Sequence, residues 1–468
     1  MERLTAADAW YLYLEGPTVH LHVTGLLLLD PTTAPKGFSF TKLRNYVTAR
    51  LDLMPALRRR LVEVPLAIDH PGWIEDPDFD LDLHLHHHLL TVGSTHDLAA
   101  FVGELASTPL ARDRPLWDMV LVEGLDGGGA AVVVKMHHCI VDGISGMDVM
   151  AHLLDLTPSP PRRRKAAVRE PEPVPSAIDA AASATWNRLT DPGRPLRAAE
   201  GVASSLANMA VASVRRRLGG AEAVAHPINA PRTRFNASIT PRRSVAFGLA
   251  PLADMKAIGR AFGVTVNDVV LAACTFGLRR YLAANDQIPD RPLVCSVPVS
   301  THGHGSGGSA NQVSTMFVNL PAQVADPTEQ LRLIHEGSQG AKEIQSSVGA
   351  DIISDVIELV PGGVFHLATR LYSLTGLADR LAPVHNLIVS NVVGSPVPLY
   401  MAGAQVVAMY PFGPLMEGTG LNVTVLSNDG EMNIGLIACP DLVPDLHSLL
   451  DGIIEGVAAL SAAADQVA

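Results

Sequence analysis

An almost uninterrupted apolar run at residues 130–136, Ala-Ala-Val-Val-Val-Lys-Met, limits how this chain can fold more than any other feature. Such a strand is typical of a sheet covered on both faces, because a strand with one exposed face alternates apolar and polar residues. An Asp126-Gly127 pair and two further glycines precede the run, and residues 116–124 form another strand pattern before them. Turns of this kind join neighbouring antiparallel strands. The pattern therefore predicts a β-hairpin whose second strand is buried on both sides.

The chain divides into three regions by the patterns that it carries. Helix and strand patterns are mixed in residues 1–155 and again in residues 241–468. Residues 156–240 differ, because a segment rich in proline and charge is followed by an alanine-rich helical stretch that ends in three arginines at 215–217. We interpret this middle region as a linker, whose basic strip is either solvated or faces anionic lipid headgroups. We predict two α/β (α+β) halves that meet at a cleft.

Composition excludes several classes of protein. Hydrophobic residues make up 47% of the 468 residues and charged residues only 18%, which is not the composition of a disordered chain. The net charge of −12 provides no basic field of the kind that nucleic-acid-binding proteins carry. The N-terminus lacks the apolar segment of a signal peptide, and no uninterrupted apolar run is long enough to span a membrane. We therefore expect a cytoplasmic protein, or one peripheral to a membrane.

Cysteines and histidines give no indication of a metal centre. The four cysteines lie far apart and form no CxxC pair, which argues against a disulfide framework or a structural zinc site and fits a reducing compartment. His84, His86 and His88 alternate along a strand pattern, and an HxHxH arrangement can bind a metal. No cysteine cluster accompanies them, so we interpret them as an exposed polar strand face and expect no metal.

Two adjacent histidines, His137 and His138, end the buried strand and are followed by an Asp142-Gly143 turn and a helical pattern at 144–155. Successive side chains of a strand point to opposite faces, so one histidine can face a cleft while the other packs inward. A neutral imidazole in a cleft can accept a proton from an attacking hydroxyl. Asp142 could orient the loop through an ion pair, and Gly143 can adopt a turn geometry closed to other residues. The alternative is a hydrogen-bonded histidine pair in the core.

A helix start at residues 265–268 is the second candidate site. Thr265 and Asp268 have the spacing of a capping box, which places Asn267 in the first helical turn. Free N–H groups and the helix dipole favour negative charge there, so the amide of Asn267 could help to stabilise an oxyanion. The alternative is an ordinary helix start, in which Asp268 is a cap.

The segment His-His-Cys-Ile-Val-Asp-Gly at 137–143 resembles the HHxxxDG signature of the superfamily of chloramphenicol acetyltransferases, condensation domains and BAHD acyltransferases. More narrowly, the chain resembles the bacterial bifunctional wax ester synthase/diacylglycerol acyltransferase family. The segments that carry this resemblance occur in order over nearly the whole chain: Pro115-Leu116-Trp117 (PLW), residues 267–272 (NDVxLA), PVS at 298–300, residues 311–321 and residues 390–396. HHxxxDG alone is moderately specific, and the whole set is strongly specific.

The resemblance implies a fold and a reaction. The fold would be two chloramphenicol-acetyltransferase-like mixed-sheet domains that face a central cleft or tunnel. His138 would be the general base that takes the proton from an alcohol, whose oxygen attacks an acyl-CoA thioester without an acyl-enzyme intermediate. His137 would be auxiliary, and Asp142 would hold the loop through a cationic partner. Long-chain acyl-CoA would be a co-substrate rather than a cofactor, and the acceptor would be diacylglycerol, a fatty alcohol or both.

Other residues are implied with less definite roles. Trp117, Asp268, Ser390 and Asn391 are candidates for the substrate site, with packing favoured for Trp117 and a structural turn equally compatible with Ser390-Asn391. Members of the family often carry an arginine shortly after PVS, and this chain has Thr301-His302 there instead. The sequence therefore does not identify the cation that would contact Asp142.

Two other functions stay open at this stage. The chain could be a superfamily acyltransferase that acts on another hydroxyl, or a lipid-binding relative with a degenerate site, which the missing arginine would favour. The apolar stretch at 351–379 fits either core helices or a surface that meets a membrane or lipid droplet. Cys139, beside His138, is more typical of packing than of a nucleophile.

Overall fold

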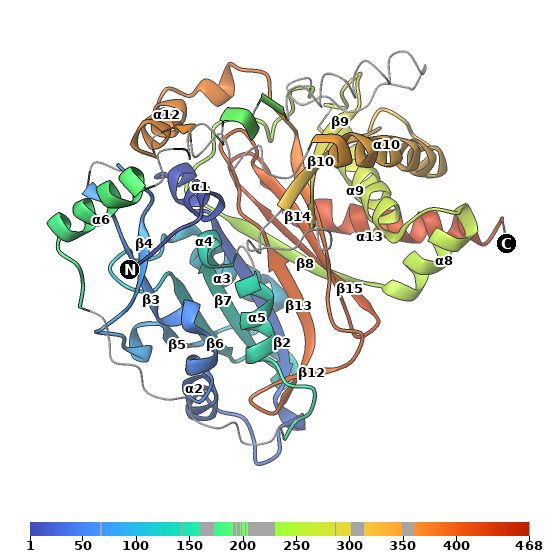
Figure 1. Cartoon of the computed structure of the whole chain (residues 1–468). Helices are drawn as coiled ribbons and strands as arrows, with labels where there is room; N and C mark the ends of the chain where they lie inside the picture. Colours follow the sequence, from blue (N-terminus) through green and yellow to red (C-terminus); the bar gives the residue numbers. More distant parts are fainter. Residues whose placement is uncertain are drawn as a thin grey trace.

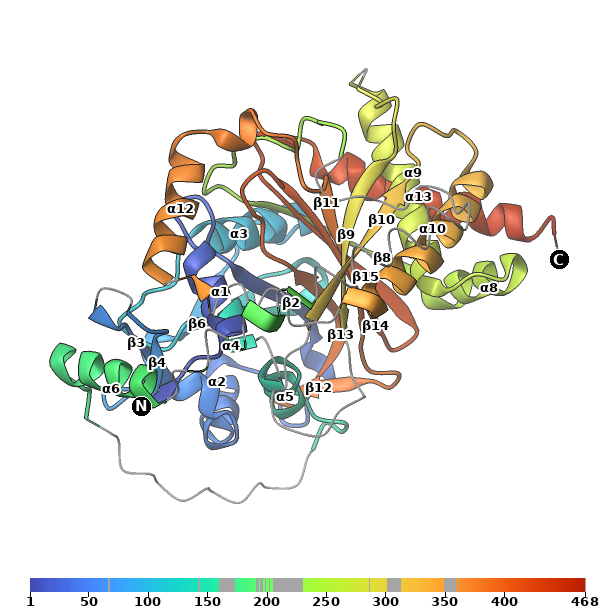
Figure 2. The same ribbon diagram turned by 45° about the horizontal axis from the view of Figure 1, so that its top comes forward.

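The computed structural model of the chain describes residues 1–65, 68–141, 144–159, 173–190, 193, 197, 199–201, 203–204, 230–285, 287–300, 313–348, 359–360 and 362–467. Over these residues the chain forms two six-stranded mixed sheets and one small three-stranded sheet, with helices packed around them (Figure 1). The mixed α/β fold with two sheets that the sequence predicts is confirmed. Figure 2 shows the same arrangement from above.

The first large sheet is built around the predicted hairpin. Its strands, in order across the sheet, are β12 (Leu399–Met401), β13 (Ala404–Phe412), β2 (His22–Asp30), β7 (Ala130–His137), β6 (Trp117–Glu123) and β5 (Leu85–Leu89). β7 lies near the middle, and all of its residues are buried, as its composition predicts. Only β5 and β6 run parallel to each other.

The second large sheet contains the remaining C-terminal strands. In order they are β10 (Val313–Leu320), β9 (Leu293–Ser300), β11 (Leu387–Val393), β14 (Leu421–Asn428), β15 (Glu431–Ala438) and β8 (Ser244–Pro251). β11 is parallel to both of its neighbours, and the other pairs are antiparallel. The small sheet consists of β1 (Glu2–Arg3), β4 (Gly72–Glu75) and β3 (Arg59–Val62).

The helices of the described residues cover these sheets. In the N-terminal part they are α1 (Ala6–Leu14), α2 (Phe40–Thr48), α3 (Thr95–Ser107), α4 (His138–Val141), α5 (Ile144–Leu153) and α6 (Ala177–Thr190). In the C-terminal part they are α8 (Leu252–Phe262), α9 (Val266–Ala283), α10 (Pro327–Val348), α12 (Gly362–Leu374) and α13 (Leu446–Ala464). Ser39 caps α2, because its side chain accepts a hydrogen bond from the backbone N–H of Lys42.

The predicted division of the chain at residue 241 does not coincide with the division of the sheets. β12 and β13 come from the C-terminal region, yet β13 pairs with β2 and completes the N-terminal sheet. Phe235, in the segment interpreted as linker, is fully buried in the C-terminal core. The two halves are therefore joined by two strands that the C-terminal region contributes to the N-terminal sheet, as well as by the chain between them.

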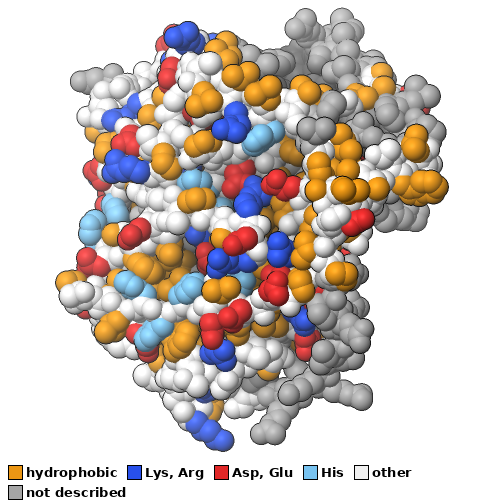
Figure 3. All heavy atoms as spheres, turned by 90° about the vertical axis from the view of Figure 1, so that its left-hand side faces the viewer, with side chains coloured by type: hydrophobic (Ala, Val, Ile, Leu, Met, Phe, Trp, Pro, Cys, Tyr) orange, Lys and Arg blue, Asp and Glu red, His pale blue; other side chains and the backbone are white. Residues whose placement is uncertain are grey.

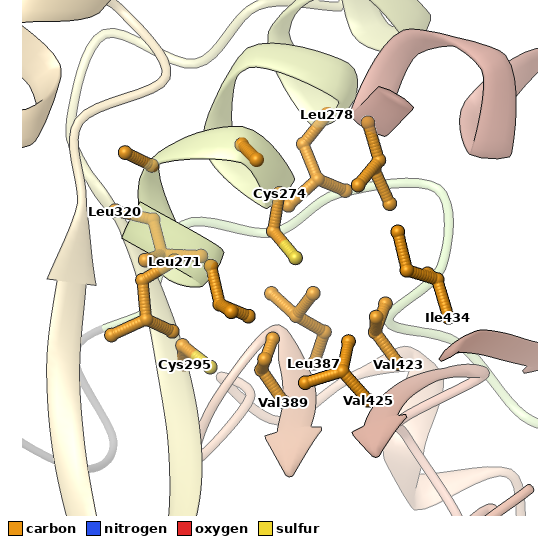
Figure 4. Packing of buried hydrophobic residues seen from close by; sticks show 14 of the residues in the cluster. Leu271, Cys274, Leu278, Cys295, Leu320, Leu387, Val389, Val423, Val425 and Ile434 are labelled. Atoms are coloured by element: carbon orange, nitrogen blue, oxygen red, sulfur yellow. The ribbon is translucent and has the colours of Figure 1, made fainter. Parts of the chain in front are cut away.

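A dense apolar core lies between α9 and the C-terminal sheet (Figure 4). Leu271, Cys274 and Leu278 of α9 point toward Val389 of β11 and Val423 of β14. α13 packs against the other side of α9, and glycines permit the close approach. A Cβ atom at Gly277 would lie 2.7 Å from the Ile453 side chain, so a larger residue could not be accommodated without displacing α13.

Of the described helices, α13 is long and apolar enough to cross a membrane, as is the bent pair α8 and α9 taken as one span. The apolar side chains of α13 that are buried against the C-terminal core include Leu449, Ile453 and Leu460. A core helix of this kind meets the same criteria of length and composition as a membrane span. The apolar character of α13 is therefore explained by its packing.

Another cluster of buried residues lies between the two large sheets and joins the two halves. It contains side chains from β2, β6, β7 and β13 of the N-terminal sheet and from β8 and β15 of the C-terminal sheet, with α3 at its edge. The four cysteines, all within the described residues, are buried. Burial alone raises the pKa of the Cys274 thiol to about 12, so this thiol is protonated and unreactive at neutral pH.

Candidate active site

The two motif histidines lie where the buried strand β7 ends, at the end of the N-terminal sheet. The backbone N–H of His137 donates to the carbonyl of Leu116 at 2.9 Å, which continues the β6–β7 ladder. The next residue, His138, starts α4, and its N–H donates to the carbonyl of Leu21 at 2.9 Å. His137 is buried, whereas His138 is only partly buried. The two rings therefore differ in access, because the strand ends at His137 and His138 already belongs to the following helix.

The hydrogen bonds of His137 determine its tautomer. The backbone N–H of Cys139 donates to Nδ1 of His137 at 3.1 Å, so Nδ1 is an acceptor and Nε2 carries the proton. Nε2 lies 3.5 Å from Oε2 of Glu15, and Glu15 is also ion-paired with Arg112. Burial, then the Arg112 guanidinium and the His138 imidazole, hold the pKa of His137 well below its ordinary value. His137 is therefore neutral at pH 7, which suits a supporting role.

Two more buried histidines extend from His137 toward the C-terminal half. His22 lies opposite His137 in the β2–β7 ladder, with ring centroids 5.9 Å apart, and the ring of His20 stacks on His22 at 5.6 Å. Burial and the nearby Arg243 lower the pKa of His20 to about 4. Both rings border a cavity of about 10 Å³ at the seam between the halves, enough for one water molecule. The interior behind the two motif histidines is therefore polar, and its imidazole rings are uncharged.

The ring of His138 is held by an aromatic side chain from α1. Tyr11 stacks on it with centroids 4.0 Å apart and an interplanar angle of 21°. The outer torsion of a histidine is broad, so the backbone alone does not fix the orientation of the ring. The stack and the hydrogen bond at the backbone of His138 together give a partly exposed imidazole a defined position.

Asn267 and Asn391 are brought together, although they are far apart in the sequence. The side-chain amide of Asn391 on β11 donates to Oδ1 of Asn267 at 3.4 Å, at the N-terminus of α9. Ser390 pairs with Thr424 of β14 in the sheet. Because successive side chains of a strand alternate, Ser390 points to the face of the sheet opposite to that of Asn391. Ser390 and Asn391 therefore cannot line one and the same surface. None of the hydrogen bonds between described residues connects the asparagine pair to His138.

Asp268 forms the capping box that the sequence predicts. Its carboxylate accepts hydrogen bonds from the backbone N–H and the hydroxyl of Thr265, at 3.0 and 2.8 Å, and Nδ1 of His335 lies 2.8 Å away. Burial raises the pKa of Asp268, but the hydrogen bonds from His335 and Thr265 outweigh that effect and lower the pKa overall. The residue is 1% exposed, which favours the cap over contact with substrate.

Trp117 is placed in the core of the N-terminal half. It is 0% exposed, its Nε1–H donates to the carbonyl of Leu57 at 2.7 Å, and its ring stacks on His84 at 4.6 Å. This geometry favours packing over contact with substrate. The stack also corrects the interpretation of the HxHxH run, because His84 precedes β5 and is buried rather than exposed on a strand face.

Asp142 and Gly143 lie outside the described residues, as do Thr301 and His302 after PVS. The predicted roles of Asp142 and Gly143 therefore stay predictions. Within the part of the chain that the structure describes, no group of three or more His, Cys, Asp or Glu side chains is arranged to hold a metal ion.

Three residues at the motif were not identified from the sequence: Tyr11, Glu15 and Arg112. Each touches a motif histidine or its partner from a segment remote in sequence. The spacing of Tyr11 and Glu15 would place them on one face of a helix, but that spacing alone does not indicate what the face contacts.

Two mixed sheets that share exchanged strands, with a histidine pair at the end of a central strand, define a class of two-sheet acyltransferases. The structure of a wax ester synthase/diacylglycerol acyltransferase from Marinobacter aquaeolei VT8 superposes with a TM-score of 0.70 at 28% identity, covering 99% of this chain and 100% of the other. The starter condensation domain of the rhizomide synthetase RzmA superposes with a TM-score of 0.56 at 13% identity, which shows a shared fold. It covers 98% of this chain and 94% of the other.

Sequence comparisons identify the family. Residues 4–270 match the wax ester synthase/diacylglycerol acyltransferase catalytic domain, and residues 309–461 match the WS/DGAT C-terminal domain. Two Mycobacterium tuberculosis relatives named as diacylglycerol O-acyltransferases are 35% and 34% identical, covering 99% and 97% of this chain and 91% and 94% of their own lengths. The chain belongs to the wax ester synthase/diacylglycerol acyltransferase family and is an O-acyltransferase of lipid biosynthesis.

Proposed function

We propose that the protein transfers a long-chain acyl group from acyl-CoA to the hydroxyl of diacylglycerol, a fatty alcohol or both, with His138 as the general base. The observation that carries this proposal is the environment of the His138 ring. It is partly exposed, stacked on Tyr11 and attached to the end of a fully buried strand. The names of the relatives, diacylglycerol acyltransferase and wax ester synthase, support the choice of acceptors.

The proposed reaction balances within one complex. The neutral imidazole of His138 accepts the hydroxyl proton while the oxygen attacks the thioester carbonyl. The tetrahedral intermediate then collapses, the carbon–sulfur bond breaks, and the imidazolium returns its proton to the departing CoA thiolate. The amide of Asn267, at the N-terminus of α9, is proposed to stabilise negative charge in the intermediate. No cofactor takes part, because acyl-CoA brings its own activated bond.

An acceptor panel tests the proposed substrates. Purified protein with palmitoyl-CoA is expected to release CoA in the presence of diacylglycerol or hexadecanol and to release it far more slowly with ethanol. Ester formation is measured alongside CoA, and His86→Ala, an exposed histidine on the edge strand β5, is the matched control with unchanged rates. Preference for an unrelated hydroxyl would favour another superfamily reaction, and lipid binding without CoA release would favour a degenerate binding protein.

We also propose that the protein works in the cytoplasm and contacts the surface of a membrane or lipid droplet. α12 exposes a stripe of leucine and valine at helical spacing, namely Val364, Leu367, Leu371 and Leu374, each half or more exposed. Its opposite face is anchored on α1, where Phe365 packs against Trp10. In Figure 1, α6 lies at the left edge and α12 at the upper left, and in Figure 3, which shows the left-hand side of that view, hydrophobic side chains gather along the upper and right-hand parts. An apolar helix face of this kind fits a lipid interface.

Vesicle flotation tests the lipid contact. The double variant Leu367→Ser/Leu371→Ser is expected to lose at least half of its binding to phosphatidylcholine vesicles loaded with diacylglycerol, because the centre of the stripe becomes polar. Its turnover of dispersed short-chain substrates should not change. Leu249→Ser/Ile288→Ser, two exposed apolar residues elsewhere, is the matched control. Equal flotation of the two double variants would contradict contact through α12.

A further inference from the structure

The segment formed by α1 and its first following residue contacts both motif histidines. Tyr11 stacks on His138 at 4.0 Å, and Oε2 of Glu15 lies 3.5 Å from Nε2 of His137. Side chains four positions apart lie on the same side of a helix, so this one face serves both contacts.

This segment is itself fixed on two sides. Thr5 caps the start of α1 by accepting a hydrogen bond from the N–H of Asp8, and α1 packs between α4 and α12. At its other end, the carbonyl of Tyr13 accepts a hydrogen bond from the hydroxyl of Thr369 at 2.9 Å. A helix held at both ends provides a rigid support for the groups that it presents.

The Glu15 contact complements the tautomer of His137. Because Nδ1 of His137 accepts the N–H of Cys139, Nε2 carries the proton, and it lies 3.5 Å from Oε2 of Glu15. Arg112 forms an ion pair with that carboxylate, so its charge is balanced while it faces the imidazole. The carboxylate therefore favours the Nε2–H tautomer over the Nδ1–H tautomer, whereas burial and Arg112 keep the ring neutral.

We propose that Tyr11 and Glu15 are positioning residues for the acyl transfer. Tyr11 orients the imidazole of His138, and Glu15 holds His137 in one tautomer beside it. The proposal rests on the proposed role of His138 as the base. A displacement of about 1 Å in a catalytic group costs on the order of 100-fold in rate, which sets the scale of the expected effects.

Steady-state kinetics of three variants tests the Tyr11 contact. Tyr11→Leu is expected to lower kcat about 10- to 100-fold with little change in KM for acyl-CoA, and Tyr11→Phe, which keeps the ring, should recover most of the activity. Tyr13→Leu, on the same helix but packed against His70 and Gly362, is the control for damage to α1. Equal losses in kcat for Tyr11→Leu and Tyr13→Leu, or no recovery in Tyr11→Phe, would overturn the positioning role.

Nitrogen-15 NMR of the histidine rings tests the Glu15 contact without using activity. The His137 signals, assigned by difference from His137→Asn, should report the Nε2–H tautomer in the wild type and a mixture of tautomers or a shifted pKa in Glu15→Gln. Identical signals in the two proteins would overturn this part of the proposal. Because the spectra do not depend on turnover, a failure here is distinct from a failure of the proposed function, which the absence of CoA release in the wild type would reveal.

Discussion

Replacing His138 with alanine is expected to lower kcat for acyl transfer by about 10²–10⁴-fold, the usual contribution of a positioned general base. The ring is only partly buried and stacks on Tyr11 at the end of the sheet, so its removal should leave the core of the N-terminal sheet intact. The fold should therefore survive, and the loss should lie in the chemical step. Initial rates of CoA release at saturating acceptor measure the effect, and the melting temperature monitors the fold.

The variant His137→Ala separates the two histidines. His137 is buried, and its Nδ1 accepts the N–H of Cys139, so its removal should cost stability as well as rate. His138→Ala should instead lose rate with little loss of stability. A fully active His138→Ala enzyme would show that this imidazole is not the base.

Replacing Trp117 with alanine is expected to lower the free energy of unfolding of the protein by about 3–5 kcal/mol, the range for deletion of a large buried ring. The ring is 0% exposed and stacked on His84, and its Nε1–H donates to the carbonyl of Leu57. Deleting it leaves a cavity and an unsatisfied carbonyl between β6 and the residues around Leu57. Urea unfolding followed by circular dichroism measures the change.

Two variants accompany this measurement. Trp117→Phe keeps an aromatic ring but loses the hydrogen bond, so it should cost about 1–3 kcal/mol. Trp186→Ala, the same substitution at a tryptophan that is 68% exposed on α6, should change the stability by less than about 0.5 kcal/mol. If the folded Trp117→Ala protein showed a strongly raised KM with normal stability, Trp117 would be a substrate contact rather than a packing residue.

Local features of this fold could be predicted where the sequence itself contains the cause. The composition of residues 130–136 predicts a strand buried on both faces, and β7 is buried throughout. Thr265 and Asp268 are three residues apart, so their capping box can be inferred without knowing the tertiary structure. The different burial of His137 and His138 was also expected, but its cause is that β7 ends at His137 and α4 begins at His138.

Features that depend on long-range pairing could not be predicted in this way. The pattern at Ala404–Phe412 indicates a strand, but nothing in it specifies that β13 joins β2 of the other half. The stack of Tyr11 on His138 joins segments more than a hundred residues apart. Ser390 and Asn391 were predicted as one unit, although the period of two in a strand already separates their side chains.

The motif residues of the site could be predicted from the sequence, but the side chains that hold them in place could not. The HHxxxDG pattern and the other motifs indicate the family, which the comparisons confirm. The ion pair of Glu15 and Arg112 behind His137 depends on how α1 packs against α4. Such contacts are set by the packing of whole elements, and no single segment of sequence encodes them.

The central claim is that the acyl group passes from acyl-CoA to the acceptor hydroxyl in one complex, with His138 as the base. Rapid-quench measurement of CoA release in the absence of an acceptor tests this claim most directly. With enzyme in excess over palmitoyl-CoA and no alcohol present, we expect no burst of CoA, and addition of diacylglycerol or hexadecanol should then yield one ester for each CoA released. His138→Ala should form neither product on the same time scale. A rapid burst of CoA, equal in amount to the palmitoyl-CoA supplied, before the acceptor is added would contradict the account, because it would show a covalent acyl-enzyme intermediate.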